Sequence, residues 1–134
     1  MIIRKPNWRA ELFAYIASAR GKKFRAGRND CALFSAGAVH AMTGFDPARG
    51  LRKYSSLKGG WAMLSEMGFA DHVEYAASLF PEIPVLQASV GDLAVIKGAD
   101  DFAIGVVQGP SIFVLTRQGM GVIPLTQAAK AFRV

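Results

Sequence analysis

The apolar residues of this chain change their spacing partway along the sequence, and this change limits the folds that the chain can adopt. In the first half they repeat at helical spacing, which predicts a helix over residues 8–19. We expect Asn7 to cap this helix and Gly21 to end it in the left-handed conformation that glycine tolerates. An apolar run of small residues predicts a second helix from about residue 30 to the residue before Gly44.

Ser56 opens a third predicted helix that ends before Gly68, and a short fourth helix is predicted over 71–79. Two prolines, Pro81 and Pro84, then interrupt the chain. The second half holds short β-prone runs separated by turn residues, at 92–97, 103–108, 111–116, 121–125 and 132–134. Helices followed by sequential antiparallel strands predict an α+β fold in which the helices are segregated from the sheet.

Length and composition favour one globular domain spanning residues 1–134. Half of the residues are hydrophobic (51%), which excludes a disordered chain. The aromatic residues at helical spacing are expected in the core: Trp8, Phe13, Tyr15, Phe34, Trp61 and Phe69. We find neither a signal peptide at the N-terminus nor an apolar run approaching the ~20 residues of a membrane span.

The single cysteine, Cys31, stands where the second helix should begin, directly after the capping residues Asn29 and Asp30. A thiol in the first helical turn lies at the positive end of the helix dipole, which favours the nucleophilic thiolate. The alternative is that Cys31 is simply a small buried hydrophobic residue. One cysteine excludes an internal disulfide and a multi-cysteine metal site, and we expect no metal or other cofactor.

Positive charge is concentrated in the first half of the chain. Residues 1–60 carry 12 Lys and Arg against three acidic residues, whereas residues 61–134 carry four against seven, and the whole chain has a net charge of +6. This asymmetry suits an anionic partner or a solvated basic surface. Nucleic acid is not favoured as the partner, because the chain lacks zinc-finger and RNA-recognition patterns and any convincing helix-turn-helix pattern.

Three motifs in order resemble the NlpC-type cell-wall cysteine peptidases, a compact branch of the papain-like fold. They are Asp30-Cys31-Ala32-Leu33-Phe34, Gly91-Asp92-Leu93-Ala94-Val95 and Ala103-Ile104-Gly105-Val106-Val107. The resemblance runs from about Phe24 to Gly109, and the rest of the chain resembles phage and prophage proteins encoded among tail genes. It implies a papain-like fold with Cys31 as nucleophile, and Asn29, Asp30 and Asp92 as neighbouring site positions.

The third motif departs from the family pattern, because Ala103 stands where the catalytic histidine should be. Of the two histidines, His40 lies on the far face of the second helix and His72 lies ahead of the sheet, so we expect both at a surface or boundary. Substitute partners for the thiol would be Asp100, Asp101 or Gln108, or a residue from a neighbouring subunit. For Asp92 itself, a strand-start or turn role is favoured over a catalytic one.

Two hypotheses follow. The first, favoured by Ala103, is a structural or assembly protein of a phage tail, with a degenerate cysteine-peptidase site and other tail proteins as partners. The second, favoured by Cys31, is a peptidoglycan hydrolase that uses a non-standard base and acts on the bacterial cell wall. Both predict a location in the virion tail, or in the host cytoplasm during assembly.

Overall fold

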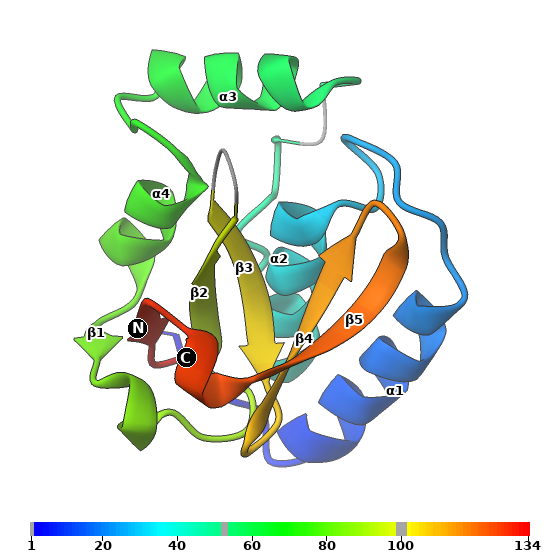
Figure 1. Ribbon diagram of the computed structural model, residues 1–134, viewed down its shortest axis with the longest axis vertical. Helices are drawn as coiled ribbons and strands as arrows, with labels where there is room; N and C mark the ends of the chain where they lie inside the picture. Colours follow the sequence, from blue (N-terminus) through cyan, green and yellow to red (C-terminus); the bar gives the residue numbers. More distant parts are fainter. Residues whose placement is uncertain (1, 52–53, 99–101) are drawn as a thin grey trace.

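The computed structural model describes residues 2–51, 54–98 and 102–134 and shows four helices followed by a sheet (Figure 1). The helices are α1 (Trp8–Arg20), α2 (Cys31–Thr43), α3 (Leu57–Glu66) and α4 (His72–Leu79). This arrangement confirms the predicted α+β class.

Capping side chains fix three of the four helix starts. The carboxylates of Asp30 and Asp71 and the hydroxyl of Ser56 accept hydrogen bonds from backbone N–H groups in the first turns of α2, α4 and α3. Asn7 does not cap α1 in this way, because its amide donates to the side chain of Glu11 instead.

Gly21 and Gly44, the two glycines predicted to end α1 and α2, have different backbone conformations. Gly44 adopts the left-handed conformation after α2, with φ 81°, as its position at the helix end requires. The expectation for Gly21 was wrong: with φ −85° it continues the right-handed conformation of α1, and its N–H bonds to the carbonyl of Ala19.

In the described part of the chain, the sheet has six strands in the order β1-β6-β2-β3-β4-β5, and all neighbours are antiparallel. The strands are β1 (Glu82–Ile83), β2 (Leu93–Lys97), β3 (Phe102–Val107), β4 (Ser111–Thr116), β5 (Gly119–Pro124) and β6 (Lys130–Phe132). Short 3₁₀ helices, η1 (Val85–Gln87) and η2 (Leu125–Gln127), connect some of them.

The expectation of sequentially paired strands holds only for β2 to β5. The C-terminal strand β6 instead returns to lie between β1 and β2, where Phe132 pairs with Glu82 on one side and Leu93 on the other.

The main core lies between the sheet and the layer formed by α1, α2 and α4. Its fully buried side chains include Leu12, Phe34, Val39, Met42, Val95, Val106 and Phe132. A smaller cluster on the other side of the sheet joins Ala94, Val107 and Ile112 to Leu125 of η2. Phe34 is therefore a core residue as expected, whereas Phe13 and Trp61 are not, with 43% and 44% of their surface exposed.

A partly buried ion pair joins the two ends of the chain to the sheet. Asp92, just before β2, accepts hydrogen bonds from the Arg4 guanidinium (3.0 Å) and from the backbone N–H groups of Val134 (3.1 Å) and Ser89 (3.0 Å). Arg4 also donates to the carbonyls of Val90 and Val134. Its pKa is lowered by burial, although the Asp92 carboxylate opposes that shift.

Within the described part of the chain, no helix is both long enough and apolar enough to cross a membrane.

Candidate functional site

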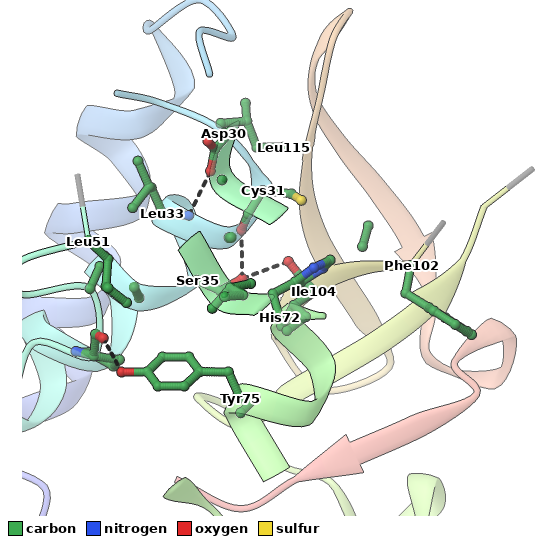
Figure 2. A pocket seen from close by; sticks show the side chains of 18 of the residues that line it. Asp30, Cys31, Leu33, Ser35, Leu51, His72, Tyr75, Phe102, Ile104 and Leu115 are labelled. Atoms are coloured by element: carbon green, nitrogen blue, oxygen red, sulfur yellow. Dashed lines mark hydrogen bonds between the residues drawn. The ribbon is translucent and has the colours of Figure 1, made fainter. Parts of the chain in front are cut away.

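A cavity of about 680 Å³ lies between α2, α3, α4 and strands β3 and β4. Its described lining residues include Cys31, His72 and Ala103, and most of the others are apolar (Figure 2). A volume of several hundred Å³ with a largely apolar lining and a few polar groups is typical of sites that bind small molecules or substrate side chains.

Cys31 is the first residue of α2 and is partly exposed in this cavity. The preceding residue, Asp30, accepts a hydrogen bond from the N–H of Leu33 (2.9 Å) and so fixes the first turn of the helix. The thiol thus lies where the backbone N–H groups and the helix dipole stabilise a negative charge.

The carboxylate of Asp30 does more than cap α2. Its second oxygen accepts hydrogen bonds from the N–H of Gly27 (2.9 Å) and from the hydroxyl of Tyr54 (2.5 Å), and the side chain is 1% exposed. Burial and the bond to Asp30 raise the pKa of Tyr54 well above its ordinary value. Asp30 therefore connects the start of α2, the loop before it and Tyr54.

Tyr54 extends this connection to the opposite wall of the cavity. Its ring packs against Gly60 of α3, where an added Cβ would lie 3.2 Å from the ring carbons. Gly27 is also required, since it has φ 80° and its Cβ position would overlap the carbonyl of Tyr54. Tyr54 could not be predicted as a site residue from the sequence, because it lies in an irregular segment without hydrophobic periodicity.

A second connection joins α2 to β3. The hydroxyl of the buried Ser35 lies 2.6 Å from the carbonyl oxygen of Ile104 and 3.0 Å from that of Cys31 (Figure 2). Ile104 follows Ala103, and Ala103 lines the cavity with Cys31. The structure therefore places Cys31, at the start of α2, and Ala103, on β3, in the same cavity, as the sequence predicted. The side chain at the β3 position is the methyl group of alanine.

His72 supplies the imidazole that lines this cavity. It is the first residue of α4, whose cap is the preceding Asp71, and its Nε2 atom is buried. Figure 2 shows His72 among the labelled residues of the cavity, together with Cys31, Ser35 and Ile104. Both histidines lie at a surface or boundary, as expected: His40 is exposed on α2 and His72 is partly buried. The sequence did not indicate that His72 also lines the cavity with Cys31.

The other residues considered from the sequence lie elsewhere. The amide of Asn29 donates to the carbonyl of Lys23 (2.9 Å), so it stabilises the loop before α2. Asp92 is held in the ion pair with Arg4 and is not among the described cavity residues. Gln108 is exposed after β3, and Asp100 and Asp101 lie outside the described residues.

A metal centre finds no support in residues 2–51, 54–98 and 102–134. Within these ranges, no three His, Cys, Asp or Glu side chains are grouped closely enough to hold an ion. The described lining of the cavity includes the thiol of Cys31 and the imidazole of His72 within a mainly apolar wall.

No curated protein matches this sequence. A family model described as a domain of unknown function, DUF6950, matches residues 3–134. The match covers nearly the whole chain, and the protein therefore belongs to the DUF6950 family.

Proposed function

We propose that this protein is a cysteine-dependent acyl-transfer enzyme, most simply a hydrolase, in which Cys31 is the nucleophile and His72 carries the proton. One observation supports this proposal above the others: the thiol at the start of α2 and the imidazole at the start of α4 line the same cavity. A nucleophile and a base in one cavity are the two components that covalent catalysis by cysteine requires.

In the proposed reaction, the Cys31 thiol gives its proton to His72 and attacks the carbonyl carbon of the substrate. A carbon–sulfur bond forms, and the leaving group departs with its electron pair and takes the proton from His72. Water then attacks the thioester, the carbon–sulfur bond breaks, and the thiol is regenerated. The dipole of α2 favours the thiolate needed for the first step.

The imidazole of His72 lies at a position where the NlpC-type resemblance does not expect a histidine. That resemblance assigns the histidine to the position of Ala103 on β3, whereas His72 comes from α4. Two features support the resemblance itself: the helix-start cysteine, and the anchoring of its helix on an antiparallel sheet through Ser35. We therefore propose an NlpC-like site in which the residue that carries the proton, His72, comes from α4 instead of β3.

The test is hydrolysis of activated esters and release of muropeptides from purified cell walls, measured for the native protein and three variants. Cys31→Ala should abolish turnover, and His72→Gln should reduce it about 100- to 10,000-fold, the usual contribution of a general acid–base group. His40→Gln is the matched control, because His40 is exposed, and should have native activity. Equal loss in both histidine variants, or activity that survives Cys31→Ala, would refute the assignment.

A second function, that of a structural or assembly protein in a phage tail, is favoured by one specific observation. The β3 residue that faces the cavity where the resemblance expects a histidine is Ala103, which has no proton to transfer. On this alternative the fold is retained for binding to other tail proteins and the site is degenerate. Folded protein that shows no turnover on either substrate class, but that co-purifies with tail subunits, would support it.

A further inference from the structure

The polar side chains around Cys31 are largely committed to bonds within the protein. Asp30 bonds to Gly27, Leu33 and Tyr54, and Ser35 bonds to backbone carbonyls. The hydroxyl of Tyr75, also in the lining, donates to the carbonyl of Pro47 (2.6 Å). These groups hold the walls in place, and their hydrogen-bonding capacity is not directed at a ligand.

The remaining wall is made mainly of hydrocarbon. Its members include Val39, Leu51, Leu64, Leu79, Phe102 and Leu115. Apart from Asp30 and His72, the acidic or basic residue among the described lining is Arg117, whose side chain is exposed beyond the end of β4. A peptide that carries carboxylates and amides would lose its hydration here with few partners in return, which is unfavourable.

The apolar surface continues outward along α3. Figure 1 shows this helix lying across one end of the molecule. No described side chain of α3 is fully buried, yet Trp61, Met63 and Leu64 all line the cavity, and Trp61 is 44% exposed. A large exposed aromatic residue that also lines a cavity marks a path along which an apolar ligand can extend.

We infer that the cavity binds the aliphatic chain of an acyl ester or thioester, and that this acyl group is transferred to Cys31. The inference rests on the proposed function for the transfer step, and on the lining alone for the binding step. In the transfer, the Cys31 sulfur bonds to the acyl carbon and the alcohol or thiol leaves with its electron pair and a proton. Water then releases the fatty acid and restores the thiol.

The first experiment measures kcat/KM for p-nitrophenyl esters with two, four, eight and twelve carbons in the acyl chain. Each methylene group of the acyl chain that moves from water into an apolar site should raise kcat/KM roughly fourfold. We therefore expect octanoate to exceed acetate by at least about tenfold, even if only two methylenes are fully buried. A flat or declining series from an active enzyme would overturn the inference and leave the proposed function intact.

A matched pair of variants tests whether α3 forms the acyl site. Met63 lines the cavity, whereas Met67 follows α3, is 44% exposed and is not among the described lining. Met63→Glu should reduce the octanoate-to-acetate ratio about tenfold or more, because it places a charge beside the chain. Met67→Glu should leave the ratio unchanged, and equal effects of the two substitutions would contradict the assignment.

Binding without catalysis separates the two proposals. Cys31→Ala should bind dodecanoate, detected by calorimetry, and Met63→Glu in the same background should weaken that binding. If dodecanoate binds and the native protein turns over no ester, the proposed function fails and the acyl site stands. If dodecanoate does not bind, the acyl site is refuted. Acyl-coenzyme A and phospholipid vesicles, used as alternative substrates, then distinguish a soluble thioester from a lipid ester as the source of the chain.

Discussion

Replacing Asp30 with alanine tests the physical basis of the site most directly, because one carboxylate holds three separate elements. It caps α2 through Leu33, closes the preceding loop through Gly27, and ties in Tyr54. Loss of the cap alone costs about 1 kcal/mol. The N–H of the buried Gly27 would also lose its acceptor, which costs about 1–3 kcal/mol.

Together with the lost Tyr54 bond, we expect Asp30→Ala to lower the free energy of unfolding by about 3–4 kcal/mol. The matched control is Asp71→Ala, because Asp71 caps α4 through the single bond to Glu74 (2.8 Å). That variant should lose only about 1 kcal/mol. For a chain of 134 residues, each kcal/mol corresponds to about 3–4 °C in Tm.

The assay is equilibrium urea unfolding, with thermal unfolding as a second measurement. Asp30→Asn gives a finer test, since the amide oxygen can still cap Leu33 while the amide nitrogen faces the N–H of Gly27. The loss in free energy of unfolding for Asp30→Asn should fall between the losses for Asp30→Ala and Asp71→Ala. Equal destabilisation by Asp30→Ala and Asp71→Ala would refute the claim that Asp30 anchors more than its own helix.

Three further changes test other parts of the fold. Arg4→Met should cost about 3 kcal/mol in urea unfolding, because it leaves the buried Asp92 carboxylate without its cation; a loss under 1 kcal/mol would contradict this. Gly105→Ala should also lower the free energy of unfolding by about 3 kcal/mol, because its Cβ would lie 2.5 Å from a backbone oxygen of β4. An unfolding midpoint equal to that of the native protein would show that β3 and β4 can separate to make room for it. Tyr54 has a raised pKa in the folded state, so its contribution is complete below the unfolded pKa of about 10 and declines as pH rises above it. The stability difference between the native protein and Tyr54→Phe should therefore be largest near pH 8 and shrink above pH 10, and a difference that grows instead would reverse the assigned direction.

The helices could be predicted from sequence because their signals are local. A capping Asp or Ser before an apolar run, and Gly44 after one, gave the bounds of α2, α3 and α4 to within a residue or two. The position of β6 had no such signal. In β6, Phe132 pairs with Leu93, which is far away in the sequence. The local pattern of a β-prone run does not indicate which other strand it will pair with.

The same reasoning explains why Cys31 was predicted as a site residue and His72 was not. The location of Cys31 at a helix start is a local property. The location of His72 in the same cavity depends on how α4 docks, and α4 packs through Val73, Ala76 and Phe80 into a core whose other members come from distant segments. A histidine at a helix start carries no mark of which cavity it will line.

The position of Cys31 by itself does not distinguish an enzyme from a structural module. Asp30 and Ser35 hold the start of α2 through bonds that any stable version of this fold would need. His72 is the residue that separates the two proposals, because it lines the cavity with Cys31 while the preceding Asp71 caps α4. If His72→Gln unfolds like the native protein yet loses turnover, the imidazole serves the reaction; if it only lowers stability, the structural alternative gains.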